Sequence, residues 1–361
     1  MSNMKEGKLQ KLWFRLNVQL TRKEKLIFSK YLAVLLGAGL AIDEAIKILR
    51  DQSKRSMRRI LDALFQSLNR GDTLSSGLAK FPHVFSPFFI NLVASGEASG
   101  NLQVNLINIK NQMEKEYELN SKVRGAMIYP AVIIFAAIVI SAGIFIFILP
   151  NVIGVFESLK LDLPLSTRTL IYVASFVQDH GFISLMILIS LGVFIYVIRK
   201  IKAFRPMLHG MLLFTPIIGG IAKKVNMARF TRSLGTMIQS GITIDEAVQI
   251  TGRTLDNIHY QRMFVELDAA IRIGEDISAV FDKHPYLVPP MASRVVHVGE
   301  QAGSLDEMLV YLAGFYEQEV SEVTENLSDL LEPILLILIG VLVGGLALSI
   351  MTPIYQVIGS F

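Results

Sequence analysis

Two pairs of neighbouring carboxylates are the residues of this chain whose types and spacing could do acid–base chemistry. Asp43–Glu44 and Asp245–Glu246 occupy matching places in two similar stretches of sequence. Paired carboxyl groups can act as general acid and general base. Both pairs, however, follow a glycine-containing break and open an apolar-periodic stretch, where the helix dipole favours acidic side chains in the first turn. We therefore predict that these carboxylates start helices, and we assign no catalytic residue.

Signatures of nucleotide, cofactor and metal chemistry are missing from the sequence. It contains no Gly-x-x-x-x-Gly-Lys-Ser/Thr phosphate loop, no His-Glu-x-x-His, no Gly-x-Ser-x-Gly and no dinucleotide fingerprint. The absence of cysteine excludes disulfides, thiolate metal sites and a cysteine nucleophile. We predict no enzyme activity and no cofactor and assign no metal ligand, and the sequence leaves open whether the cytoplasmic domains bind a metal. The histidines lack metal-ligand spacing: His83, His180, His209, His259, His284 and His297.

A short motif, Gly-Glu-x-x-Gly-x-Leu, occurs twice, at Gly96–Leu102 and Gly299–Leu305. Its glycines are expected to end one helix, because glycine tolerates a positive φ. Its glutamates are expected to accept hydrogen bonds from backbone N–H groups of the following helix. Two interpretations stay open, a structural turn and a contact for a partner protein. The residues concerned are Gly96, Glu97 and Gly100 in the first copy, and Gly299, Glu300 and Gly303 in the second.

The repeated motif belongs to a longer internal repeat with an offset of about 202–203 residues. Ala41–Ala45 aligns with Thr243–Ala247, and Pro130 aligns with Pro333. Each copy is a polar helical stretch followed directly by a long apolar run. The sequence therefore predicts an all-α integral membrane protein with two repeated cytoplasmic helical-bundle domains and three transmembrane helices.

Composition and uncharged runs locate the membrane segments. Apolar residues make up 52% of the chain and charged residues 18%, and the mean hydropathy is +0.48. Three runs without charge approach or exceed the roughly 20 residues that cross a bilayer. The predicted organisation is a basic amphipathic segment 1–21, a first repeat domain 22–125, a membrane helix 126–150, an external loop 151–180, a membrane helix 181–198, a cytoplasmic linker 199–222, a second repeat domain 223–332 and a membrane helix 333–358.

Lysine and arginine flank the first two spans on one side, which places the N-terminus and both repeat domains in the cytoplasm. No Lys or Arg follows Arg294, so the C-terminus is placed outside only because a third crossing is counted. Residues 1–126 carry 20 Lys and Arg against 11 Asp and Glu, and residues 199–332 carry 13 against 17. The basic excess favours either anionic lipid or an acidic partner protein. Nucleic acid is not expected, because the basic residues are not interleaved with aromatic residues.

Several membrane-segment residues carry separate predictions. Pro130 and Pro333 fall near predicted span starts, where proline costs little. Gly340 and Gly344 form a small-residue pair for helix packing. Glu332, aligned with Tyr129, is either a membrane-edge contact or a solvated carboxylate. No ionisable residue lies within a span, which argues against an ion-coupled transporter.

The chain resembles the PilC/GspF family, the inner-membrane platform proteins of type IV pilus assembly and type II secretion. The resemblance begins near residue 22 and covers nearly all that follows. It is carried in the first copy by Phe28–Ala45, Arg70–Leu78, Gly96–Leu102 and Pro130, and in the second by Pro216–Lys223, Ala228–Ala247, Gly274–Ser278, Gly299–Leu305 and Pro333.

The resemblance implies a non-enzymatic platform in the bacterial inner membrane. Such a platform couples a cytoplasmic assembly ATPase to the insertion of pilin or pseudopilin subunits, contacts other inner-membrane assembly proteins and forms a homo-oligomer. A membrane transporter or channel built from an internal repeat is the alternative. The sequence leaves open whether the filament serves a pilus, secretion or competence system.

Overall fold

The computed structural model describes residues 20–143, 204–215 and 218–327, with isolated positions between 172 and 201 and between 332 and 351. These residues contain helices and no strand, which confirms the all-α prediction. The chain divides into two compact units. One comprises Met1–Asn120 and His209–Val320, and the other comprises Ser121–Leu208 and Ser321–Phe361. The predicted segment 1–21 lies outside the described residues except for its last two.

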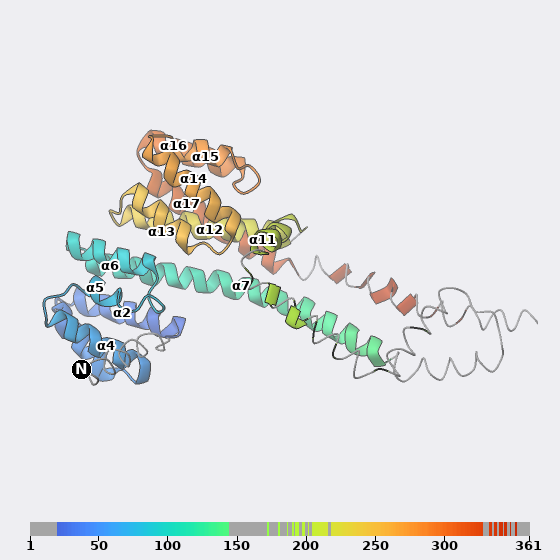
Figure 1. The fold of residues 1–361 in the computed structure, drawn as a ribbon, viewed down its shortest axis with the longest axis horizontal. Coiled ribbons are helices and arrows are strands. Elements are labelled where there is room, and N and C mark those ends of the chain that lie inside the picture. The colour runs from blue at the N-terminus through green and yellow to red at the C-terminus, as the bar shows by residue number, and fades with distance from the viewer. Residues whose placement is uncertain are drawn as a thin grey trace, which may run out of the picture. The chain divides into compact units, whose positions relative to one another are not determined.

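The described helices of the first half follow one another in a short-looped series (Figure 1). They are α2 (Arg22–Gly37), α3 (Ile42–Gln52), α4 (Arg55–Leu68), α5 (Leu74–Leu78), α6 (Pro87–Ser99) and α7 (Leu102–Gly143). We call α2–α7 the first series.

The second half contains a matching order of helices. They are α11 (Arg205–Phe214), α12 (Ile218–Gln239), α13 (Ile244–Thr254), α14 (Ile258–Arg272), α15 (Ile277–Asp282), α16 (Pro290–Ala302) and α17 (Leu305–Glu325). We call α12–α17 the second series. From α3 and α13 onward, corresponding helices begin 202 or 203 residues apart.

Local sequence explains where these helices begin. Thr21 and Glu24 form a reciprocal capping box at the start of α2, which satisfies free N–H groups there. Thr73 caps α5 through the N–H of Ser76, and Ser86 caps α6 with Pro87 in its first turn. Asp43–Glu44 and Asp245–Glu246 lie in the first turns of α3 and α13, as predicted.

Each series has its own hydrophobic core. In the first, the rings of Phe28, Phe85 and Phe89 pack together near Leu32, which is fully buried. In the second, Phe230 lies at the centre of an aromatic cluster with ring-centroid distances of 5.4–6.1 Å. Its partners are Tyr260, Phe264 and Phe281.

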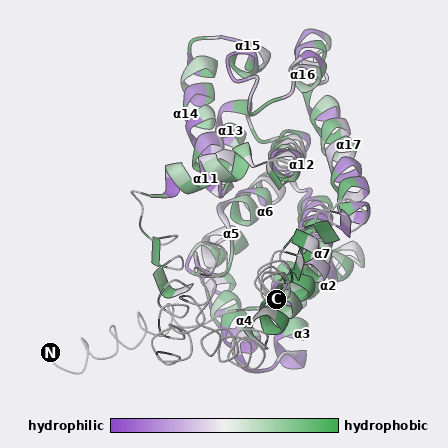
Figure 2. Ribbon diagram, turned by 90° about the vertical axis from the view of Figure 1, so that its right-hand side faces the viewer, coloured by the Kyte–Doolittle hydropathy of each residue, from purple (hydrophilic) through white to green (hydrophobic). Residues whose placement is uncertain are grey.

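Helix α7 runs without a break for 42 residues, from Leu102 to Gly143. It contains the only stretch, among the residues the structure describes, that is long and apolar enough to cross a membrane. Only 6% of its most apolar window is buried within the chain, and Figure 2 shows this hydrophobic ribbon in green. In the first copy, the end of the polar helical stretch and the start of the apolar run that follows it therefore form one helix.

Pro130 corrects one expectation. It lies inside α7 rather than at a helix start, because the helix that begins at Leu102 passes through the predicted span boundary at 125–126 without interruption. At this interior position proline removes one helical hydrogen bond. The corresponding helix α17 is described only to Glu325, followed by Asn326 and Leu327.

Candidate functional site

The two motif glutamates bind the start of a short helix. Glu97 accepts hydrogen bonds from the N–H groups of Leu74 at 2.5 Å and Ser75 at 2.9 Å, both at the start of α5. Glu300 does the same at the start of α15, where the N–H groups of Ile277 and Ser278 lie 2.5 and 3.2 Å away. Each carboxylate therefore compensates free N–H groups and the positive end of a helix dipole.

This geometry corrects the prediction that the glutamates cap the following helix. The short helices α5 and α15 precede them in sequence and pack against α6 and α16, which brings their N-termini beside the last turns of those helices. Sequence proximity pointed to the wrong helix, because the capping contact spans 22 or 23 residues. The contacts give Glu97 and Glu300 a structural role, and a partner contact at these turns stays a prediction.

The motif glycines divide into two kinds. Gly100 and Gly303 end α6 and α16 with φ values of 74° and 68°, as predicted. Gly96 and Gly299 instead lie inside those helices, which corrects the expectation that they end them. A Cβ on Gly96 would lie 2.8 Å from the Cα of Leu102, so the missing side chain allows α7 to fold back closely against α6.

The residue before the first motif joins the two series. The Ser95 hydroxyl donates a 2.6 Å hydrogen bond to the carbonyl of Ser240, which follows α12. The amide of Asn108, on α7, lies 3.3 Å from the Ser240 hydroxyl. Helix α6 also contacts α12 and α13. The α6–α7 face of the first series is therefore docked on the second series within one compact unit.

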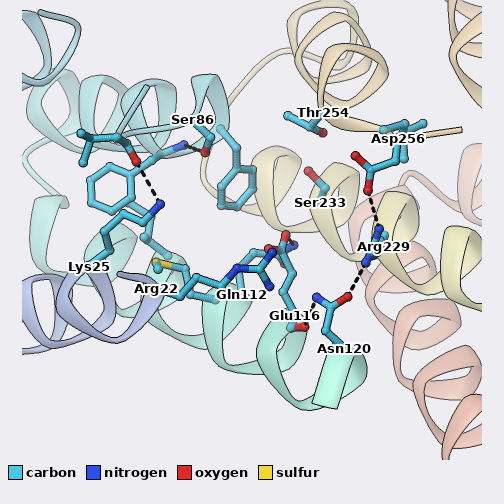
Figure 3. Close-up of a pocket in the computed structure, with 16 residues that line it drawn as sticks. Arg22, Lys25, Ser86, Gln112, Glu116, Asn120, Arg229, Ser233, Thr254 and Asp256 are labelled. Atoms are coloured by element: carbon cyan, nitrogen blue, oxygen red, sulfur yellow. Dashed lines mark hydrogen bonds and ion pairs between the residues drawn. The ribbon is translucent and has the colours of Figure 1, made fainter. Parts of the chain in front are cut away.

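A cavity of about 310 Å³, lined by both polar and apolar side chains, lies along this docked face (Figure 3). Arg229 bridges it, donating to Asp256 at 2.9 Å and to the amide oxygen of Asn120 at 2.6 Å. The cavity is lined by Arg22, Lys25, Val84, Ser86, Phe88, Phe89, Ile109, Gln112, Met113, Glu116, Asn120, Arg229, Ser233, Thr254, Leu255 and Asp256.

Two lining groups are electrostatically unusual. The Lys25 ammonium donates to the carbonyl of Val84 at 3.0 Å, and burial together with the nearby Arg22 cation lowers the pKa of Lys25. The buried Gln112 Oε1 has no hydrogen-bond partner in the described part of the chain, although its amide nitrogen donates to Glu116. The lining presents charged, hydroxyl and amide side chains, which can bind a polar group. None of these lining residues was singled out from the sequence, because they come from separate helices of both series and meet only in the folded chain.

One group has the composition of a metal site, although its histidine showed no metal-ligand spacing in the sequence. The ligand atoms of Asp276, His297 and Glu300 lie within 4.8 Å of one another. Both Glu300 oxygens already accept backbone hydrogen bonds, and His297 Nδ1 lies 3.2 Å from the Ser278 hydroxyl. We interpret the group as a hydrogen-bonded cluster that holds the start of α15.

The predicted membrane-segment residues are only partly described. Glu332 is helical and exposed, and Gly340 and Gly344 are helical with no described atom within 4 Å of an added Cβ. Their roles as a membrane-edge contact and a packing surface stay predictions. Most of the predicted loop 151–180 and most of the spans 181–198 and 333–358 lie outside the described residues.

Comparison with known proteins assigns the family. The sequence profile described as type II secretion system protein F matches this chain twice, over residues 28–150 and 230–353. The chain belongs to the type II secretion system protein F family. The two matches begin within α2 and within α12 and cover the rest of both helix series together with most of the apolar run at the end of each copy.

Relatives in this family carry two kinds of names. The type IV pilus assembly protein PilC of Thermus thermophilus is 33% identical over 94% of this chain and 83% of its own length. PilC of Pseudomonas aeruginosa is 30% identical over 91% of this chain and 88% of its own length. The type II secretion system protein F of Aeromonas hydrophila is also 30% identical, over 92% of this chain and 86% of its own length.

Proposed function

We propose that this chain is a non-enzymatic platform of the bacterial cytoplasmic membrane for type IV pilus biogenesis or type II protein secretion. In this role it couples a cytoplasmic assembly ATPase to the insertion of pilin or pseudopilin subunits. It works with other inner-membrane assembly proteins and with further copies of itself. The family match over both halves of the chain supports this proposal.

The observation that carries the mechanism is the unbroken helix α7. Its first turns pack in the first series, with Leu106 and Ile109 fully buried. Its later residues, including Ile128 and Phe135, expose 64% and 68% of their surface, as expected for side chains that face lipid. A continuous helix transmits a displacement along its axis, so a push on the helical bundle would move the membrane segment.

The proposed arrangement keeps the organisation expected from the sequence. Two repeated helical domains, 22–125 and 223–332, face the cytoplasm, and three membrane helices follow at 126–150, 181–198 and 333–358. The N-terminus is cytoplasmic and the C-terminus external. The matching helix order and the three matched pairs of positive-φ glycines support the duplication. The glycine pairs are Gly39 and Gly241, Gly71 and Gly274, and Gly100 and Gly303.

Gentle detergent co-purification from the native host tests the proposal. A tagged chain should bring down an ATPase with a phosphate loop and pilin-like subunits, identified by mass spectrometry. A secretin or a retraction ATPase among them would separate secretion from pilus assembly. Recovery of the chain without an ATPase or pilins, in a complex that stays intact, would contradict the platform and favour the transporter alternative.

A further inference from the structure

The contact between the two series is formed by α6 on one side and α12 on the other. The helices that correspond to them in the repeat, α16 and α2, leave the matching faces exposed. In the first series, Phe88 and Ser95 of α6 face the second series. Their counterparts 203 residues later are Met291 and Val298 of α16. Phe88 is 7% exposed, whereas Met291 is 45% exposed and Val298 is 56% exposed. The face that α6 uses for docking is therefore open on α16.

This open face is a groove between α16 and α17 of about 590 Å³. It contains Tyr311, the counterpart of Asn108, and Tyr311 is 56% exposed. We call it the α16 groove; its lining includes Pro290, Met291, Arg294, Val298, Met308 and Tyr311.

The receiving side of the docked contact also has an open counterpart. Ser233 and Thr236 of α12 are 6% and 8% exposed, but the residues 202 positions earlier, Tyr31 and Val34 of α2, are 53% and 60% exposed. Ile27, the counterpart of Arg229, is 39% exposed. Spacings of four and three residues put these three apolar side chains on one face of α2. We call Ile27, Tyr31 and Val34 the α2 stripe.

We propose that the α16 groove of one chain binds the α2 stripe of a second copy, repeating between chains the contact that joins the two series within a chain. This inference rests on the proposed function, which includes association with further copies of the chain, and it names the surfaces through which the copies bind. Polar residues of the internal contact are replaced by apolar ones on both open faces: Ser95 by Val298, Asn108 by Tyr311, and Ser233 by Tyr31. Apolar faces that stay exposed in a single chain indicate a site for a partner.

The two regions that carry these surfaces have net charges of opposite sign, although the groove lining itself contains one charged residue, Arg294. The N-terminal region that contains α2 has nine more basic than acidic residues, counting 20 against 11 over residues 1–126. The region that contains the α16 groove has an acidic excess, counting 13 against 17 over residues 199–332. A contact between the α16 groove of one copy and the α2 stripe of another brings these regions together. Their opposite net charges favour this contact over one between two identical surfaces.

A contact between two different faces is head-to-tail, so it repeats from copy to copy and either closes a ring or extends a filament. Copies that share one membrane in one orientation are related by rotation about the membrane normal, which favours a closed ring.

Cysteine cross-linking tests the contact directly, because the native chain has no cysteine. The internal pair Ser95–Ser240 predicts that Val298 of one copy lies beside Ala38 of the next. We would co-express an Ala38→Cys chain and a Val298→Cys chain with different tags in native membranes, and treat them with a short bismaleimide. The matched control replaces Val298→Cys by Val265→Cys, on α14, which is 71% exposed.

The expected product has twice the mass of one chain, carries both tags and forms at least tenfold more than with the Val265→Cys control. Comparable cross-linking within either single variant would indicate a like-to-like contact and overturn the proposal. The proposal would also be overturned if native mass spectrometry finds oligomers but the Ala38→Cys and Val298→Cys pair cross-links no more than the Val265→Cys control. Co-purification of the ATPase and pilins from the same membranes is measured separately. If these partners are retained but the cross-link does not form, the proposed contact surface is rejected and the proposed platform function is not.

A substitution gives an independent readout. Val298→Asp places a charge in the α16 groove and should convert the oligomer to single chains, with the thermal midpoint of each chain unchanged because the side chain is exposed. Val265→Asp should leave the oligomer intact. An unchanged oligomer in Val298→Asp would overturn the proposal.

Discussion

The hydroxyl of Ser95 and the carbonyl of Ser240 are 2.6 Å apart although 145 residues separate them in sequence. The bond joins the last turns of α6 to the turn after α12, and so connects the first series to the second. Ser95 immediately precedes Gly96, so the Gly-Glu-x-x-Gly-x-Leu turn lies directly beside the contact between the two series. The turn joins α6 to α7, and in the first series residues of both helices contact the second series of the same chain.

Loss of the Ser95 hydroxyl should loosen the contact between the series. Ser95→Ala removes a hydrogen bond worth about 0.5–1.5 kcal/mol and leaves the Ser240 carbonyl without this donor. We expect faster amide hydrogen exchange in α6 and at the Ser240 turn, measured by mass spectrometry. Ser99→Ala, which removes only a local bond to the Ser95 carbonyl, is the control. Equal exchange in the two variants would contradict a docking role for Ser95.

Removal of the capping carboxylates should destabilise each bundle. Glu97→Ala leaves two N–H groups at the start of α5 without their acceptor, and Glu300→Ala does the same for α15. We expect each change to lower the free energy of unfolding by about 1–3 kcal/mol. Thermal unfolding of the detergent-solubilised chain by circular dichroism measures this. A pair of variants with wild-type midpoints and defective filament assembly would instead show that the turns are partner contacts.

An added methyl group should have opposite effects at a closely packed helix glycine and at an open one. Gly96→Ala forces its Cβ against the Leu102 backbone and should lower the free energy of unfolding by about 1–3 kcal/mol. Gly314→Ala, within α17, meets no atom within 4 Å and should raise it by about 0.5–1 kcal/mol, because alanine favours the helix. The same thermal measurement applies. Similar midpoints for both variants would refute the close approach of α6 and α7.

Stability should fall at alkaline pH through a buried tyrosine. Burial raises the pKa of Tyr316 to about 12, with a smaller contribution from Glu319. An unfolded tyrosine ionises near pH 10, so the unfolded state releases its proton first and folding stability is lost as the pH rises from about 10 to about 12. In Tyr316→Phe the midpoint should fall less over this window. Tyr117→Phe, at a position 60% exposed, should follow the wild type.

Local rules made much of the fold predictable. The acidic first turns of α3 and α13 and the glycines that end α6 and α16 depend on a few neighbouring residues, so the sequence indicated them correctly. Pro130 shows the limit of such rules. A proline suggests a helix boundary, but the apolar and polar parts of α7 continue as one helix around it.

The sequence by itself determined the helical class, the starts of α3 and α13, and the family, because these depend on composition, short spacings and a motif repeated 203 residues apart. Tertiary structure decided which groups meet. Glu97 reaches backward to α5 since the short helix folds against α6, and no periodicity encodes that return. It also decided that Ser95 is half-buried while its counterpart Val298 is exposed. Two similar stretches of sequence differ in burial because one packs against its own chain and the other leaves the same face open.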